Sequence, residues 1–223
     1  MMTKLISLLS ISDSLSIAEA QNAGAASPFG GRQTLESLER RGIIRRFSVA
    51  HSSHHVRWAL EVSTPVLECV KNLGSALAAY HGLRPIGQPW SDASHNWRQD
   101  RIPLEADHLL GRPIYTRTLL FAFLLPDIDG TTLIRVVPMR NITLTPTKLV
   151  RDGLLSEQRV GTILRYRVAL SSQCAMEHKA LLNALVDSMP DFRAEALVAD
   201  RIRRVGLGRK AYAKHLNNLR DED

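Results

Sequence analysis

Apolar residues at the start of the chain recur at helical spacing. The segment TKLISLLSIS places its leucines on one face of a helix. The next segment, SLSIAEAQNAG, predicts a second, short helix that starts near Ser14 or Ser16 and stops at Gly24. Two helices separated by a short polar turn indicate that a compact helical unit opens the chain.

A third helix is predicted in SPFGGRQTLESLERRG. Ser27 has the residue type of an N-cap and Pro28 suits the first helical position, while Leu35 and Leu38 are spaced to face a core. Gly42 then stops the helix. The pair of glycines ahead of Arg32 weakens the first turn of this helix, because each costs up to about 1 kcal/mol relative to Ala.

The periodicity then changes to the alternation of strands. IIRRFSVA and VRWALEV flank the polar turn HSSHH, which predicts a β-hairpin. LSIAEAQNAGAASPFGGRQTLESLERRGIIRR resembles the winged helix-turn-helix superfamily of bacterial DNA-binding regulators, over about a quarter of the chain. In that pattern the third helix ends in Leu, charged residues, Gly and two aliphatics, here Leu38, Glu39, Arg40, Arg41, Gly42, Ile43 and Ile44. The resemblance implies a winged helix-turn-helix over residues 1–63.

Residues 64–111 predict one long helix and a connecting segment. Over 64–83 the apolar positions recur at helical spacing, namely Val66, Val70, Leu73, Leu77 and Tyr80. Such a helix either packs on its own domain or pairs with its copy in a dimer. The stretch after it is rich in Pro, Trp and polar residues, which is typical of a connecting segment.

Residues 112–173 predict a second winged helix-turn-helix. YTRTLLFAFLL and TTLIRVV read as helices around a turn at 127–130, and TPTKLVRDGLL as a third helix with Thr145 as cap and Pro146 at the first helical position. LVRDGLLSEQRVGTILRYRVAL then repeats the order of the first unit: aliphatic, charges, Gly, two aliphatics and a hairpin. Gly153 matches Gly42, so the sequence predicts an internal repeat of about 111 residues.

Residues 174–223 predict a C-terminal helical domain. EHKALLNALVDSM forms one helix, Pro190 breaks it, and DFRAEALVADRIRR forms another with Asp191 as its cap. After a turn at Gly206-Leu207-Gly208 the apolar spacing resumes in RKAYAKHLNNL. VADRIRRVGLGRKAYAKHLNNL resembles the helix-turn-helix core of many bacterial regulators. Its predicted inward residues are Ala196, Leu197, Ile202, Leu207, Tyr212, Leu216 and Leu219.

Charge and composition favour a polyanionic partner. The 223 residues carry 29 Lys and Arg against 22 Asp and Glu, a formal charge of +7. The two cysteines, Cys69 and Cys174, fit neither a disulfide framework nor a zinc signature, so we expect a reducing cytoplasm. No signal-peptide cleavage site follows the start, and no apolar run reaches the roughly 18 residues of a membrane span.

A recognition helix lies in the major groove, where Arg pairs with guanine, and Asn and Gln with adenine, while flanking cations neutralise phosphates. The three units therefore predict a set of DNA-contacting residues, with Phe29 exposed beside the first of them. Which of the three units contacts DNA stays open. The predicted set is Arg32, Gln33, Arg40, Arg45, Arg46, Arg57, Lys148, Arg151, Arg165, Arg167, Arg203, Arg204, Arg209, Lys210, Lys214 and Asn217.

Other chemistry has little support in the sequence. His51, His54 and His55 sit in one predicted turn without a nearby Cys or carboxylate, so we expect no metal site and no cofactor. No phosphate-binding Gly loop, HExxH motif or nucleophile elbow is present, and no nucleophile, acid and base occur in a pattern that predicts an enzyme.

These patterns predict a mainly α fold with small β-hairpin wings, in which tandem winged helix-turn-helix units precede a C-terminal helix-turn-helix. The predicted function is that of a sequence-specific transcriptional regulator that binds double-stranded DNA as a homodimer, in the cytoplasm and associated with the nucleoid. A plasmid-type replication initiator, which also uses paired winged helices, is one alternative. A protein-interaction adaptor that does not touch DNA is the other.

Overall fold

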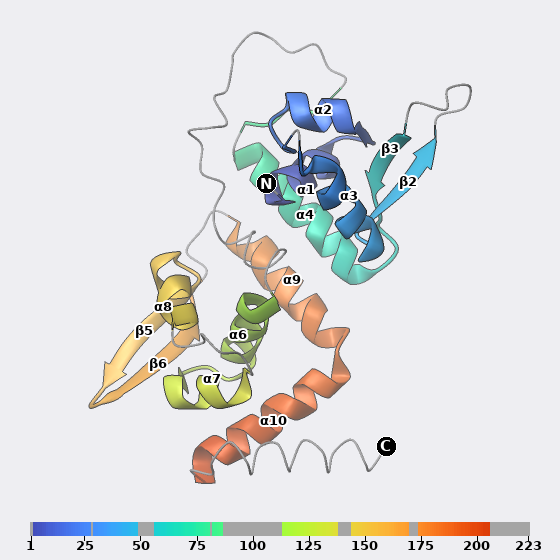
Figure 1. Cartoon of the computed structure of the whole chain (residues 1–223). Coiled ribbons are helices and arrows are strands. Elements are labelled where there is room, and N and C mark those ends of the chain that lie inside the picture. The colour runs from blue at the N-terminus through green and yellow to red at the C-terminus, as the bar shows by residue number, and fades with distance from the viewer. Residues whose placement is uncertain are drawn as a thin grey trace. The chain divides into compact units, whose positions relative to one another are not determined.

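The computed structural model describes residues 2–27, 29–48, 56–80, 82–86, 113–137, 144–169 and 174–205. The chain divides into two compact units, one of residues 1–111 with 176–181 and the other of residues 112–175 with 182–223 (Figure 1). Helices make up most of the described residues, and each unit contains one three-stranded antiparallel sheet. The predicted combination of helices with small β-hairpins is confirmed at this level.

The first unit places one very short strand ahead of its hairpin. The strand β1 pairs with β3, which also pairs with β2, so the sheet order is β1-β3-β2. The N-cap of the second helix is Ser16, the later of the two predicted starts. In chain order the elements are α1 (Met2–Ile11), β1 (Leu15–Ser16), α2 (Ile17–Asn22), α3 (Gly31–Arg40), β2 (Ile44–Ser48), β3 (Val56–Leu60) and α4 (Pro65–Tyr80).

The second unit repeats this arrangement. Its sheet order, β4-β6-β5, corresponds to the order β1-β3-β2 of the first unit. The register corresponds as well: Ile128 lies opposite Tyr166, and Leu15 lies opposite Trp58. The predicted internal repeat is therefore confirmed as a repeat of backbone structure. The elements are α6 (Pro113–Leu124), β4 (Ile128–Asp129), α7 (Gly130–Val136), α8 (Leu144–Arg151), β5 (Leu155–Val160) and β6 (Ile163–Val168). The helix α9 (Ala175–Asp187) follows, with residues 176–181 in the first unit, and α10 (Pro190–Val205) belongs to the second unit.

Both units end the helix before the hairpin in the same way. Gly42 has φ of 69° and Gly153 has φ of 77°, in the left-handed region that Gly enters without strain. The Ile43 N–H donates to the Leu38 carbonyl at 3.0 Å, and in the second unit the equivalent bond measures 2.9 Å. These bonds satisfy carbonyls at the helix end and turn the chain sharply into the first hairpin strand.

The core of the first unit is built on α1, whose side chains from Lys4 to Ser10 are all buried. The helix packs against α4, which turns Leu73 and Leu77 inward. Of the two alternatives for this long helix, packing on its own domain is the one observed. Tyr80, the last of the apolar positions at helical spacing, is exposed, because it lies in the last turn of α4.

The closest approach of α1 and α4 is at Gly74. A Cβ added there would lie 2.2 Å from the Ser10 hydroxyl oxygen, which itself donates to the Ile6 carbonyl at 2.8 Å. Ser75 donates its hydroxyl proton to the Ser10 carbonyl at 3.2 Å. Only a residue without a side chain allows the two backbones to come this close.

Two helix starts differ from the prediction. Although Ser27 accepts the Gly30 N–H at 2.7 Å, α3 begins at Gly31, because the chain there must pass close to Ala26: a Cβ at position 31 would lie 2.7 Å from that of Ala26. The predicted first residue, Pro28, lies outside the described residues. In the second unit α8 begins before Thr145, and Pro146 is tolerated in its first turn because N–H groups there have no partner within the helix.

The helix α10 packs on α6 through an aromatic and ionic cluster. The rings of Phe121 and Phe192 lie 4.7 Å apart, and the Arg117 guanidinium lies over both of them while it pairs with Glu195. The predicted inward position of Ala196 is confirmed.

Three other predictions for α10 differ from the structure, and they concern Leu197, Pro190 and Asp191. Leu197, predicted to face inward, is 72% exposed, because the buried stripe of α10 follows Phe192, Ala196 and Ala199. Pro190 and Asp191 lie within α10 rather than before it, as Pro suits the first helical position. The Gly206–Gly208 turn and the helix predicted after it, along with the side chain of Ile202, lie outside the described residues.

The left-handed helix end gives a first prediction. Replacing Gly42 by Ala should reduce the free energy of unfolding by about 1–2 kcal/mol, because an L side chain is strained at this φ although no atom lies within 4 Å of the added Cβ. Asn, which enters the left-handed region more easily, should cost less than Ala. Urea unfolding of both variants checks this, and equal costs for the two would contradict it.

The contact at Gly74 gives a second prediction. Gly74→Ala should cost about 1–3 kcal/mol, because α1 and α4 must move apart to admit the methyl group. The cost should be smaller when Ser10 is also Ala, since the nearest atom is then gone. A double-mutant cycle by urea unfolding measures the difference. Simple additivity of the two single costs would show that the contact is not the cause.

Candidate nucleic-acid interface

In the first unit, the outer face of α3 displays basic and amide side chains. Leu35 and Leu38 anchor the opposite face in the core, which leaves Arg32, Gln33 and Arg40 exposed. The side chain of Arg32 is 74% exposed, and its Nε lies 2.9 Å from the Glu36 carboxylate. An exposed pair of this kind is weak, so the guanidinium stays available to another anion.

The hairpin beside α3 adds two more arginines. Arg45 and Arg46 follow the buried Ile44 on β2, and both side chains are more than half exposed. Arg46 lies 3.4 Å from a Glu39 carboxylate oxygen, and Arg45 lies 4.0 Å from one of Glu61. These carboxylates reduce the positive potential of the surface without burying the arginines.

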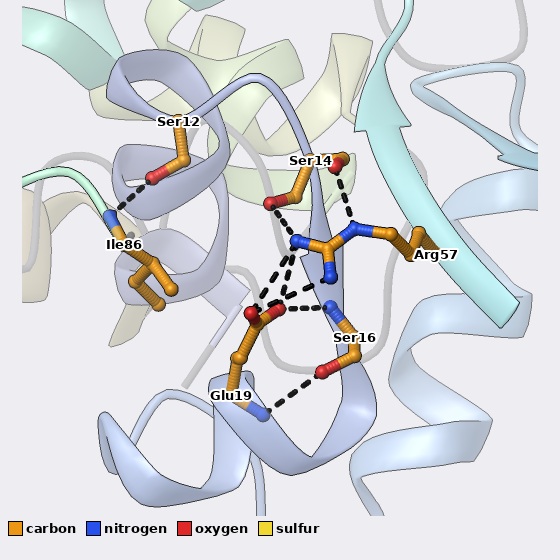
Figure 2. A network of polar contacts seen from close by, with 6 residues as sticks. All are labelled: Ser12, Ser14, Ser16, Glu19, Arg57 and Ile86. Atoms are coloured by element: carbon orange, nitrogen blue, oxygen red, sulfur yellow. Dashed lines mark hydrogen bonds and ion pairs between the residues drawn. The ribbon is translucent and has the colours of Figure 1, made fainter. Parts of the chain in front are cut away.

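Arg57 has a different environment from the other predicted site residues. Figure 2 shows its guanidinium between Ser14 and Glu19, which brings β3, β1 and α2 together. It donates to the Ser14 hydroxyl at 2.8 Å and to the Ser14 carbonyl at 3.1 Å, and it lies 3.0 Å from the Glu19 carboxylate. Since its side chain is only 27% exposed, its charge is used within the unit.

Glu19 also closes the start of α2. Its carboxylate accepts the Ser16 N–H at 2.7 Å, and the Ser16 hydroxyl accepts the Glu19 N–H at 3.2 Å, which is a capping box. Burial raises the pKa of Glu19, but hydrogen bonds from Ser16 and the charge of Arg57 outweigh it, so that the pKa lies below its usual value. The carboxylate is therefore ionised at neutral pH.

The second unit presents basic residues on α8 and its hairpin. Lys148 places its ammonium 5.5 Å from the centre of the Tyr115 ring, and Arg151 lies 3.5 Å from Asp152. Arg165 is exposed on β6. Arg167, on the same face of the strand, lies 2.7 Å from Asp127. The predicted residues of this unit thus gather beside one helix and one strand.

Asp127 is a residue whose role the sequence did not reveal. It lies in the turn before β4 with φ of 63°, and the hydrogen bond from Arg167 is the first cause of its lowered pKa. Its carbonyl accepts from Arg203 at 3.4 Å. Arg203 and Arg204 both pair with Asp200 on α10. Arg203 is accordingly used inside the unit, whereas Arg204 is exposed.

The second unit also has apolar surface that was not predicted. Val160 and Ile163, which flank the tip of the hairpin, are both about half exposed. A groove of about 430 Å³ lies next to them, lined among others by Ile134, Pro146 and Tyr166. In the first unit Phe29, just before α3, is 98% exposed, as predicted.

Several predicted residues cannot be placed. Arg209, Lys210, Lys214 and Asn217 lie outside the described residues, as do the three histidines of the first hairpin turn. Within the described ranges no group of three or more His, Cys, Asp or Glu side chains could hold a metal ion. None of the described helices is long and apolar enough to cross a membrane.

The sequence was also compared with models of known protein families and with curated proteins. Neither comparison found a match. The basis for a functional proposal is therefore the geometry of the two units and the charges on their helices and hairpins.

The capping box and its ion pair give a third prediction. Glu19→Gln should lower the free energy of unfolding by about 1–2 kcal/mol at neutral pH, because it removes a charged acceptor from Ser16 and Arg57. Because the pKa of Glu19 is lower in the folded than in the unfolded protein, its ionised carboxylate stabilises the fold at pH values above the unfolded-state pKa. This stabilisation is lost as the pH falls through the folded-state pKa. The gap between the two proteins should therefore close in acid.

Urea unfolding at neutral pH and at a series of decreasing pH values below the ordinary Glu value of 4.5 measures this gap. Glu36→Gln, which removes the exposed partner of Arg32, is the matched control and should cost about 0.5 kcal/mol or less. An equal loss for Glu19→Gln at both pH values would show that the charge of Glu19 has no part in the effect.

Proposed function

We propose that the chain is a sequence-specific transcriptional regulator that binds double-stranded DNA through tandem winged helix-turn-helix units. One observation carries the proposal: the order of helix, strand, two helices and hairpin occurs twice with the same sheet order. In each copy the helix before the hairpin and the hairpin itself turn arginines to the surface. This is the pair of elements with which winged helices contact DNA.

In the proposed complex α3 enters the major groove, which is about 12 Å wide and admits a helix. Arg32 and Gln33 lie in its first turns, where side chains reach base edges, and their groups suit guanine and adenine respectively. Arg45 and Arg46 contact phosphates from the hairpin. Arg57 has no direct role, since it holds the hairpin in place through Glu19 and Ser14.

The second unit has a shorter helix at this position. Lys148 and Arg151 lie on α8, and Arg165 lies on the hairpin strand β6. We propose that these residues bind mainly the phosphate backbone, because lysines and hairpin arginines act chiefly through charge. With two units on one chain, binding by the first raises the effective concentration of the second at the neighbouring DNA.

Two observations favour the alternatives. Paired units on one chain also suit a replication initiator of the plasmid type. The carboxylates next to Arg32 and Arg46, and the exposed apolar tip at Val160 and Ile163, favour a protein-interaction adaptor. Binding to a duplex separates the adaptor from the other two, and a selection from random duplexes shows whether the preferred site belongs to a promoter or to an origin repeat.

The fourth prediction tests the α3 surface directly. Replacing Arg32, Arg40 and Arg45 by Ala should weaken duplex binding, and the loss of Arg40 and Arg45 should flatten the slope of log affinity against log salt by up to roughly 2, at about 0.9 for each phosphate contact. Folding should survive, because all three side chains are exposed. Fluorescence anisotropy with a labelled duplex at several salt concentrations measures both quantities.

The matched control removes the same charge elsewhere. Lys71, Arg84 and Lys179 are exposed and lie outside α3 and its hairpin, so their replacement by Ala should leave the slope nearly unchanged. If both triple variants lose affinity equally, α3 is not the reading element. If the unmodified chain binds no duplex at any salt concentration, the proposal of a DNA-binding regulator is wrong.

A further inference from the structure

The strand β5 forms an open edge of the sheet in the second unit. Since β6 lies between β4 and β5, only one side of β5 is hydrogen bonded to a described strand. All its side chains after Leu155 are exposed, and Figure 1 shows the hairpin extending beyond the helices of its unit. An open strand edge offers unpaired N–H and C=O groups to any strand that fits it.

The geometry of the hairpin fixes which residues of β5 face this edge. Val160 lies opposite Ile163 across a two-residue turn in which Gly161 has φ of 62°. The residues that flank such a turn exchange hydrogen bonds with each other, and every second residue along the strand then points its backbone groups away. Of the exposed residues of β5, Glu157 and Arg159 are therefore the ones whose backbone groups point to the open edge.

Charge then selects one way to pair this edge with its own copy. Outward residues must lie opposite outward residues in an antiparallel pair. A two-fold axis at Gln158 places Glu157 opposite Arg159 of the second copy, and Arg159 opposite Glu157 of the second copy. An axis at Glu157 or at Arg159 would instead bring two identical charges together, which is unfavourable.

We propose that two copies of the chain associate by antiparallel pairing of β5 with β5, centred on Gln158. The two three-stranded sheets then join into one, with an ion pair and a pair of backbone hydrogen bonds on each side of the axis. Glu157 lies opposite Tyr166 within its own hairpin and accepts a hydrogen bond from it, so its carboxylate is already oriented. Val160 comes to lie opposite Ser156 of the second copy.

The corresponding edge of the first unit does not have this complementarity. Its edge strand, β2, carries Arg45 and Arg46 in succession and no acidic residue. A second copy of β2 would bring arginines close together, which opposes pairing. The contrast makes the inference specific to β5 and provides a control strand of the same type within the same chain.

The test measures mass in the absence of nucleic acid, so it does not depend on the proposed function. Sedimentation equilibrium of the full chain should show a dimer that dissociates on dilution, since so short an interface is weak. Glu157→Arg and Arg159→Glu should each raise the dimer Kd by at least about tenfold, because each places like charges opposite each other on both sides of the axis.

The double variant Glu157→Arg with Arg159→Glu restores both ion pairs in reversed order. Its dimer Kd should return to within about threefold of the original, and because it contains both substitutions it also controls for folding. Arg46→Glu on β2 should leave the Kd unchanged. A chain that stays monomeric at every concentration, or a dimer that is insensitive to the single changes, would overturn the proposal, as would a double variant that fails to recover.

Discussion

Each unit depends on one backbone constraint, a glycine in the left-handed region at the end of the helix before the hairpin. Gly42 and Gly153 let the helix stop within one residue and send the chain back as a strand. A gentler exit would move the hairpin away from the helix, and the exposed arginines of the two elements would no longer share one surface. The same left-handed glycine and the same backbone hydrogen bond end the helix in both units, which indicates that this turn is part of the repeated structure.

The sheets are held by different side chains in the two units. In the first, Arg57 reaches from β3 to the start of α2 and pairs with Glu19. In the second, Arg167 on β6 pairs with Asp127 ahead of β4. Each ion pair links the middle strand of its sheet to a residue close to the shortest strand. The pair in the first unit is largely shielded from solvent, whereas the pair in the second unit is exposed and adds little stability. The net count of basic residues therefore overstates the positive charge available to a polyanion, because some arginines, such as Arg57, pair with carboxylates inside their own unit.

Much of the fold could be read from local pattern. The spacing of Leu35, Leu38 and Gly42 predicted where α3 lies and where it ends, because the core face and the stop are properties of neighbouring residues. Its start at Gly31 could not be predicted, since it depends on the approach to Ala26. The strands β1 and β4 are too short for any periodicity. Leu197 was misplaced because the face that α10 buries is chosen by α6, distant in sequence. For the candidate site, the apolar spacing of the helices predicted which side chains are exposed. It could not predict that Arg57 pairs with Glu19, or that Arg203 pairs with Asp200 and donates to the Asp127 carbonyl.

The burial of α1 from Lys4 to Ser10 has a consequence for how the first unit is made. Its main partner, α4, begins more than fifty residues later, at Pro65. At 5–20 residues per second, the ribosome takes roughly 3–14 s after the end of α1 to complete that partner at Tyr80. During this time α4 is absent, and the side chains from Lys4 to Ser10, which are buried in the folded unit, lack their main packing partner. Of the first unit, α1 is thus the segment whose apolar side chains wait longest for their main partner during synthesis.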